Sequence, residues 1–334
     1  MFFKAAVLLK KNTIKILKLK KPILKPHQVF VKIIYSSICH TQLQEIKGTR
    51  GKDKFLPHCL GHEGVGKIIE KHKSVKKFKK GDLVCLSWIK GSGHDSGGVT
   101  YEDIKGNKIN GGPVHTFNEY AVISQNRLYK IKKTRNLKTR VLFGCALSTS
   151  YNALNNISLK NSKTICIIGA GGLGLSTVII AKELGYKKII VIDKIKKKLN
   201  IAQKLGATHI LDSLKAIDFK SQIDVTVECT GNIDVLKNSI LIPKKFGGKL
   251  IFIGNYPNNS KLLLDPWIVI QGVTLLGAWN DLKPFDNSFK KLEKLLRKKN
   301  LDIFFGNKIY KLDNIMSAIK DFESGKIIRP LIKL

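Results

Sequence analysis

The sequence predicts two domains, one β-rich and one α/β with a parallel sheet, and the β-rich domain resumes after the α/β domain ends. A chain of 334 residues exceeds the usual size of one compact core, which favours two domains. Short β-type runs dominate the first 120 residues. After Cys145, apolar strands and helical stretches alternate, which is typical of an α/β domain.

The first part of the chain predicts a compact all-β domain. Short apolar runs at Val29–Ile34, in HEGVGKIIE (62–70) and in GDLVCLSWI (81–89) are separated by Gly and His. Strong helical periodicity is hard to find before residue 140. We therefore expect strands and turns there.

The stretch after Cys145 predicts a βαβ unit. KTICIIGAGGLGLSTVIIAKELGYKKIIVID gives an apolar strand, a glycine turn, a helix that ends at Gly185 and a second strand that ends at Asp193. Further buried strands are predicted in THIL (208–211), DVTVECTG (224–231) and KLIFIG (249–254). The helical stretch KKKLNIAQKLGA lies between them, so we expect a parallel sheet covered on both faces.

The C-terminal residues are predicted to complete the first domain. NSFKKLEKLLRKKN (287–300) is amphipathic and helical, and residues 309–334 give a strand, a helix, a glycine stop and a closing strand. We expect a β-rich domain of residues 1–146 and 280–334, and an α/β domain of residues 147–279.

The net charge of +36 raises the alternative of a basic nucleic-acid-binding protein. The lysines are, however, spread from end to end, which a coding bias toward Lys on solvated surfaces would produce. The charge therefore says little about function, and nucleic acid is not the expected partner.

The cysteines and the N-terminus predict a cytoplasmic protein. Nothing resembles a targeting or membrane-spanning segment. The six cysteines are far apart and form no CxxC pair, which suits free thiols in a reducing compartment. They are Cys39, Cys59, Cys85, Cys145, Cys166 and Cys229.

The glycine turn at 169–174 matches G-x-G-x-x-G and predicts a dinucleotide site. Gly169 permits the tight turn, Gly171 lets backbone N–H groups approach a pyrophosphate, and Gly174 lets helix and strand pack closely. Asp193, at the end of the next strand, can accept hydrogen bonds from the adenosine ribose. A carboxylate there favours NAD over NADP, although nearby lysines could weaken its repulsion of a 2′-phosphate.

Three residues could hold a catalytic zinc ion. Zinc takes thiolate and imidazole ligands, and a catalytic site keeps three protein ligands and one open position, which Cys39, His62 and Cys145 would satisfy. Taken singly, each also fits an ordinary buried residue, so the residues alone leave both interpretations open.

The sequence motifs around these residues resemble those of the zinc-dependent medium-chain dehydrogenase/reductase family, and in particular those of its alcohol dehydrogenases. ICHTQ, LPHCLGHEGVGKIIE, KKGDLVC, TFNEYAVI, FGCALSTSYNAL and SGKIIRPLI occur in the family's order along nearly the whole chain. The resemblance implies a GroES-like catalytic domain interrupted by a Rossmann domain, with NAD(H), one catalytic zinc and a homodimer or homotetramer.

The resemblance also implies roles for individual residues. The zinc ligands match Cys39, His62 and Cys145, Glu63 stands behind the metal, and Thr41 matches the hydroxyl that relays the proton. The positions that match coenzyme contacts are His40, Thr149, Gly169, Gly171, Gly172, Leu173, Gly174, Asp193, Lys198, Gly254, Asn255 and Arg329.

The chain departs from the family pattern at two places. The stretch 86–117 contains no cysteine, so the structural zinc of many relatives is not expected, and His94, Asp95 and His115 are expected to be solvated loop residues. Gln42 stands where an Asp commonly orients the zinc-bound histidine, and Gln44 stands where a histidine often ends the proton relay.

The predicted activity is hydride transfer between an alcohol, or its aldehyde or ketone, and NAD(H). Zinc would lower the pKa of the alcohol and Thr41 would accept its proton. The first alternative is a metal-independent quinone or enoyl reductase of the same superfamily, which lacks these ligands. The second is the nucleic-acid-binding protein on the same fold.

Overall fold

The structure is a computed structural model that describes residues 1–132, 136–155, 157, 163–217, 223–279 and 284–334. The chain folds into two compact units. The first comprises Met1–Cys145, Lys283–Lys290 and Asn300–Leu334, and the second comprises Ala146–Leu282 and Lys291–Lys299. The expected fold class, a GroES-like domain interrupted by a Rossmann-type domain, is confirmed. Residue 280, where the β-rich domain was expected to resume, lies outside the described residues.

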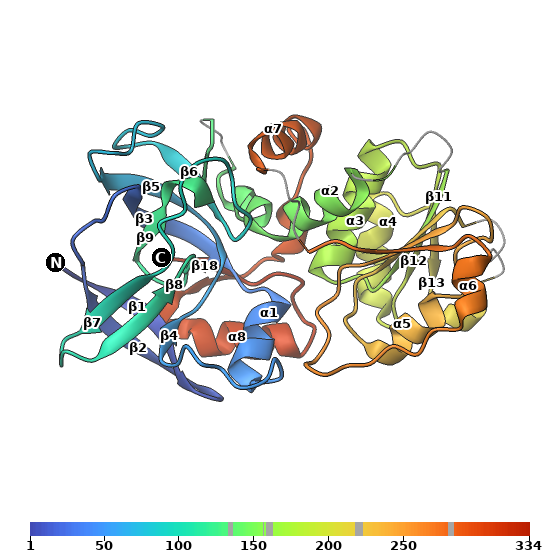
Figure 1. The fold of residues 1–334 in the computed structure, drawn as a ribbon, viewed down its shortest axis with the longest axis horizontal. Coiled ribbons are helices and arrows are strands. Elements are labelled where there is room, and N and C mark those ends of the chain that lie inside the picture. The colour runs from blue at the N-terminus through green and yellow to red at the C-terminus, as the bar shows by residue number, and fades with distance from the viewer. Residues whose placement is uncertain (133–135, 156, 158–162, 218–222, 280–283) are drawn as a thin grey trace. The chain divides into compact units, whose positions relative to one another are not determined.

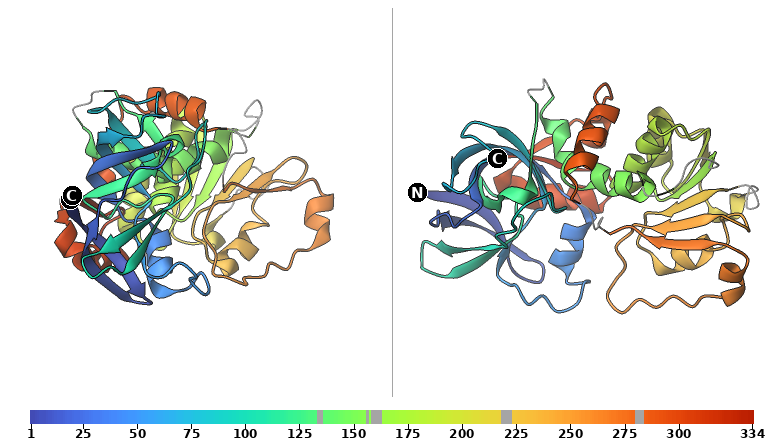
Figure 2. Two further views of the ribbon diagram at one scale, coloured as in Figure 1. Left: turned by 60° about the vertical axis from the view of Figure 1, so that its left-hand side comes forward. Right: turned by 45° about the horizontal axis from the view of Figure 1, so that its top comes forward.

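The first unit is built from a closed barrel and a larger sheet, and both chain termini belong to it (Figures 1 and 2). The barrel order is β1-β2-β7-β8-β4, formed by Phe2–Lys10, Thr13–Lys20, Val99–Asp103, Lys108–Gly112 and His58–Cys59. The sheet order is β10-β6-β5-β3-β18-β17, formed by Leu128–Lys130, Leu83–Ser87, Glu63–Lys71, Gln28–Ser37, Leu331–Lys333 and Ile309–Lys311, and β9 (Tyr120–Ser124) also pairs with β3.

The tail completes this unit through strand pairing. Strand β18 pairs antiparallel with β3, and Leu331 lies opposite Ser37. Helix α8 (Ile315–Glu323) precedes it and ends before Gly325, whose φ of 71° is the left-handed conformation that stops a helix. The expected strand, helix, glycine stop and closing strand are therefore all present.

One helix interrupts the part of the chain that was expected to be all β. Helix α1 (His40–Lys47) begins after the N-cap residue Cys39 and ends at Gly48, whose φ is 64°. It presents only Leu43 and Ile46 to a core that it shares with α8, its neighbour in Figure 1. Two apolar positions in eight residues give too little periodicity to be recognised in the sequence.

The second unit is a doubly wound parallel sheet. Its order is β13-β12-β11-β14-β15-β16, and each adjacent pair among the described strands is parallel. The order reverses between β11 and β14, so the right-handed crossovers place α3 and α4 on one face and α5 on the other (Figure 1). The strands are Thr164–Ile168 (β11), Lys188–Ile192 (β12), His209–Leu211 (β13), Val225–Glu228 (β14), Lys249–Phe252 (β15) and Thr274–Gly277 (β16).

The helices of this unit follow the predicted alternation. They are α2 (Ala146–Asn155), α3 (Gly172–Glu183), α4 (Lys196–Leu205), α5 (Ile233–Ser239) and α6 (Pro266–Ile270), and α7 (Asp286–Leu295) runs from the first unit into the second. Among the described residues of both units, 3-10 helices are formed by η1 (Gln125–Arg127), η2 (Lys138–Gly144), η3 (Leu214–Ala216), η5 (Asp302–Phe304) and η6 (Leu312–Asn314). Strand β16 was not predicted, because its four residues lie at the edge of the sheet and show no alternation.

The stretch 86–117 contradicts the expectation of a solvated loop at one of the three named residues. It contains strands β7 and β8 of the barrel, and His115 is fully buried with its Nε2 2.7 Å from the Tyr101 hydroxyl. His94 is exposed, whereas Asp95 is half-buried and forms ion pairs with Lys90 and Arg127. His115 follows β8 and is buried against Tyr101 of β7, a contact that spacing in the sequence alone does not reveal.

Within the described ranges, every helix is too short or too polar to cross a membrane.

Candidate metal centre and coenzyme site

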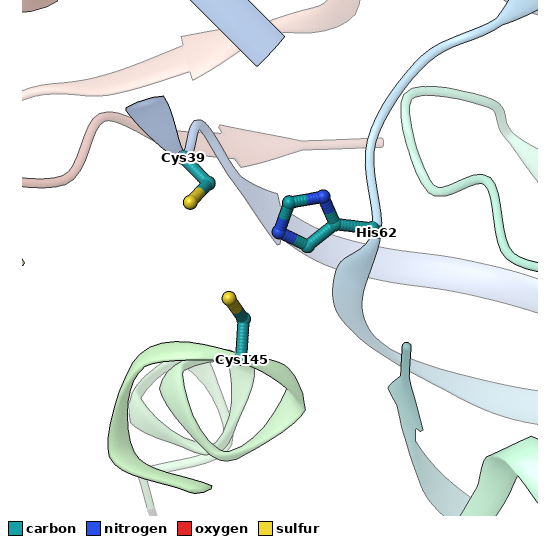
Figure 3. Close-up of side chains that lie close together, drawn as sticks. All are labelled: Cys39, His62 and Cys145. Carbon is teal, nitrogen blue, oxygen red and sulfur yellow. The ribbon is translucent and has the colours of Figure 1, made fainter. Parts of the chain in front are cut away.

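Three ligand atoms meet inside the first unit. Among the described residues, Cys39, His62 and Cys145 form a group of potential metal ligands whose ligand atoms all lie within 4.8 Å of one another. Figure 3 shows the two sulfurs and one ring nitrogen of His62 pointing toward a common centre. The residues come from the N-cap of α1, the residue before β5 and the residue after η2.

Two glycines let the ligands approach so closely. A Cβ on Gly61, which precedes His62 and has a φ of 89°, would lie 2.5 Å from Oγ1 of Thr116. A Cβ on Gly144, which precedes Cys145, would lie 2.4 Å from the carbonyl oxygen of Leu86. Real Cβ atoms essentially never lie this close to another atom, so both positions require glycine.

Gln42 orients the ring of His62 from behind. Its Oε1 accepts the backbone N–H of Cys39 at 3.1 Å, and its Nε2 lies 2.6 Å from Nδ1 of His62. The other ring nitrogen, Nε2, is buried and has no hydrogen-bond partner in the described part of the chain. A buried imidazole nitrogen without a partner is expected where a ligand is to bind.

The donor set fits a catalytic zinc ion. Zn–S bonds are about 2.3 Å long, so ligand atoms around tetrahedral zinc lie about 3.8 Å apart, close to the spacing of this group. Two thiols and one imidazole leave one position open, as catalytic zinc sites do. The residues present therefore fit the ion.

The electrostatics of the group favour a thiolate at Cys39. A hydrogen bond from Cys145 lowers the pKa of Cys39 well below its ordinary value, and the positive charge of Arg329 lowers it further. The same hydrogen bond and burial raise the pKa of Cys145. Burial opposes a charge on His62, but the nearby sulfur of Cys39 and its negative charge raise the pKa of His62.

A buried ion pair stands behind these ligands. Nη1 of Arg329 lies 2.8 Å from Oε1 of Glu63, and both side chains are almost fully buried. The hydroxyl of Ser37 donates to the same oxygen at 2.5 Å. Burial raises the pKa of Glu63, against the lowering effect of Arg329. Ser37 was not singled out in the sequence, since only its place at the end of β3, two residues before Cys39, hints at this contact.

The remaining predicted residues of this unit lie near the ligands or at the surface. Thr41 is half-buried, and its Oγ1 lies 3.8 Å from Sγ of Cys39. His40 is exposed, and its ring meets that of Phe322 edge-on at a centroid distance of 6.3 Å. Arg329 was expected to contact pyrophosphate, and in the structure its measured partner is Glu63.

In the second unit, the glycine turn has the geometry of a dinucleotide site. A Cβ on Gly174 would lie 1.7 Å from the carbonyl oxygen of Gly169, so helix and turn pack as closely as expected. A Cβ on Gly171 would meet nothing within 4 Å, which leaves open space at the N-terminus of α3, a favourable place for an anion. Gly172 and Leu173 form the first turn of that helix.

The other predicted coenzyme residues of this unit lie beside the glycine turn, after a strand of the sheet, or in helices α2 and α4. Asp193 accepts the N–H groups of Ala170 at 2.8 Å and of Ile195 at 2.9 Å, so its carboxylate lies against the turn. Lys198 is a half-exposed residue of α4, and Gly254 and Asn255 follow β15. Thr149 is buried in α2, and its Oγ1 has no partner in the described ranges. These positions fit a dinucleotide, and their individual roles stay predictions.

Comparison with known proteins identifies two family domains. Residues 25–133 match the alcohol dehydrogenase GroES-like domain, and residues 172–298 match the zinc-binding dehydrogenase domain. The chain is 26% identical to the class-3 alcohol dehydrogenase of Caenorhabditis elegans over 92% of its length and 90% of that protein. It is 27% identical to alcohol dehydrogenase-like 3 of Arabidopsis thaliana, over 92% of its length and 89% of that protein.

Among solved structures, benzyl alcohol dehydrogenase from Acinetobacter calcoaceticus superposes with a TM-score of 0.85 at 25% identity. The match covers 100% of this chain and 99% of that enzyme. The similarity therefore extends over both units.

Proposed function

Because the chain belongs to the alcohol dehydrogenase family of medium-chain dehydrogenases/reductases, we propose that it is a zinc-dependent enzyme that transfers hydride between an alcohol, or its aldehyde or ketone, and NAD(H). The observation that carries the proposal is the group formed by Cys39, His62 and Cys145, with their ligand atoms within 4.8 Å of one another. A metal-free reductase would have no reason to keep Nε2 of His62 buried without a partner beside two thiols.

When bound, zinc polarises the oxygen of the alcohol or carbonyl as a Lewis acid, and the nicotinamide exchanges the hydride. The chain's own residues supply the rest of the chemistry. Cys39, His62 and Cys145 hold the ion and leave one position open for substrate. The Thr41 hydroxyl, 3.8 Å from Sγ of Cys39, takes the proton of the alcohol and returns it in the reverse reaction. Gln44 cannot titrate, so the proton leaves this hydroxyl through other groups.

NAD(H) is the proposed coenzyme because Asp193 presents a carboxylate beside the glycine turn. A carboxylate there accepts hydrogen bonds from the ribose hydroxyls of NAD and repels the 2′-phosphate of NADP.

We further propose one domain of residues 1–146 and 280–334 and a second of residues 147–279. We also propose a homodimer or homotetramer and a cytoplasmic location. The last is supported by the free state of all six cysteines.

The proposal is tested by measuring zinc per chain in protein purified without added metal or chelator. We expect about one zinc per chain in the wild type and a loss of most of it in Cys39→Ala or His62→Ala, because two ligands hold zinc poorly. Both variants should lose alcohol oxidation and keep NADH binding.

Cys166→Ala is the matched control. It removes another fully buried thiol, in β11, and should retain zinc and activity. Wild-type protein that is folded, binds NADH and contains almost no zinc would instead support the metal-independent reductase.

A further inference from the structure

Asn152 is a buried amide that finds no partner. It lies in α2, is 6% exposed, and neither Oδ1 nor Nδ2 makes a hydrogen bond in the described part of the chain. Thr149, one helical turn earlier, is 7% exposed and leaves its Oγ1 unpaired in the same way. Residues three apart lie on one face of a helix. Three polar atoms without partners therefore share one buried face of α2.

Such a residue destabilises the protein unless something binds it. A buried amide without hydrogen bonds loses the interactions that it makes with water in the unfolded chain. Asn is also a poor residue for the interior of a helix, where Leu or Ala would serve better. An unsatisfied Asn152 is therefore best explained by a polar ligand that supplies both a donor and an acceptor.

Helix α2 is attached to the helix that follows the glycine turn of the proposed coenzyme site. Ser150 donates to the carbonyl oxygen of Leu173 at 3.1 Å, and its Oγ lies 3.1 Å from Oγ1 of Thr177. These bonds attach α2 to the first turns of α3, which carry the glycine turn. Ser150 lies about 100° around the helix from Thr149 and about 160° from Asn152, so the face of Thr149 and Asn152 is not used by this attachment.

We propose that Asn152 binds the nicotinamide half of the coenzyme, with its amide pairing to the carboxamide or to the hydroxyls of the nicotinamide ribose. Both groups offer a donor and an acceptor, as the two unpaired atoms of Asn152 require. Thr149, one of the positions that match coenzyme contacts in the related family, lies on the same face. The inference rests on the proposed use of NAD(H) and adds a residue that determines coenzyme affinity.

The test compares Asn152→Leu with the wild type in two measurements. Leu keeps the branching and the number of side-chain heavy atoms of Asn and removes its polar atoms, so the variant without coenzyme should melt at a higher temperature. Its Kd for NADH should nevertheless rise about tenfold or more, as the loss of a buried hydrogen-bonded pair predicts. Its Kd for ADP, which lacks both the nicotinamide and the nicotinamide ribose, should not change.

Asn155→Leu is the matched control. Asn155 is exposed on the same helix, so the substitution brings the same gain in helix propensity and should leave both dissociation constants unaltered. Asn152→Ala provides a second, smaller replacement if Leu disturbs folding.

An Asn152→Leu enzyme that oxidises alcohols and binds NADH like the wild type would overturn this inference and leave the proposed function intact. Equal losses of NADH and ADP affinity would also overturn it, because Asn152 would then act on the glycine turn. A wild-type protein that binds no NADH would overturn both proposals.

Discussion

At the scale of single residues, the ion pair of Glu63 and Arg329 has the largest consequences. The two side chains are 0% and 3% exposed, and their distance of 2.8 Å makes each the neutralising partner of the other. Charges this deeply buried are tolerated when paired and costly when one partner is removed. The pair also lies close enough to Cys39 for the charge of Arg329 to lower the pKa of that thiol.

We predict that Arg329→Met lowers the free energy of unfolding by about 3–5 kcal/mol, because it leaves the Glu63 carboxylate buried and unpaired. Urea unfolding of the zinc-free protein measures this loss. The double variant Glu63→Gln/Arg329→Met should recover most of it, since neither charge then remains.

The exposed pair of Lys4 and Asp313 provides the control, with side chains 42% and 60% exposed. Lys4→Met should change the free energy of unfolding by less than about 1 kcal/mol. If Arg329→Met has an effect as small as this, the buried pair does not stabilise the fold.

At the scale of elements, two glycines in the turn between β11 and α3 have different roles, one in packing and one in coenzyme binding. Gly174 faces the carbonyl oxygen of Gly169, whereas Gly171 faces open space at the start of the helix. Substitution by Ala should therefore lower mainly the stability at position 174 and mainly the coenzyme affinity at position 171.

We predict that Gly174→Ala destabilises the protein by at least about 1–3 kcal/mol, because its Cβ would collide with the backbone. Gly171→Ala should change stability by no more than about 1 kcal/mol, the usual difference between Gly and Ala at an N-cap. It should still weaken NADH binding by about tenfold or more, since its Cβ would lie where the pyrophosphate is expected. Thermal unfolding and NADH titration measure the two effects. A Gly171→Ala protein with normal affinity would argue against pyrophosphate binding at this turn.

At the scale of the whole molecule, the burial of His115 contributes to how stability depends on pH. Burial lowers the pKa of His115 to about 3, and Nε2 of its neutral ring is hydrogen-bonded to the Tyr101 hydroxyl. An unfolded chain binds a proton at this histidine below its ordinary pKa of about 6.5. Because the folded pKa is the lower one, His115 leaves stability unaffected above that pH and reduces it as the pH falls toward 3.

We predict that His115 alone removes about 2–3 kcal/mol of unfolding free energy between pH 6.5 and pH 4.5, at no more than about 1.4 kcal/mol per pH unit. Urea unfolding at several pH values gives the slope. His115→Gln should flatten it over this range, whereas the same change at the exposed His94 should not. Equal slopes for the wild type and His115→Gln would show that His115 takes up a proton within the folded barrel.

Much of the second unit was predictable because its signals are local. The apolar strands, the glycine turn and Asp193 lie within one short stretch, and a βαβ unit is built from neighbours in the chain. In the first unit the strands were predictable, but α1 was not, because its buried face has only Leu43 and Ile46. His115 was misjudged for a related reason, since burial inside a closed barrel depends on strands far apart in sequence.

The sequence by itself determined the two-domain fold class, the dinucleotide turn and, through its resemblance to a family, the three candidate zinc ligands. Only the tertiary structure decided that these ligands meet. The antiparallel pairing of β3 with β5, in which Ser36 lies opposite Gly64, brings the strand end before Cys39 next to His62. The close approach of Gly144 to Glu63 then adds Cys145. Backbone pairing and packing over long sequence separations therefore assemble the site, and no local pattern encodes those distances.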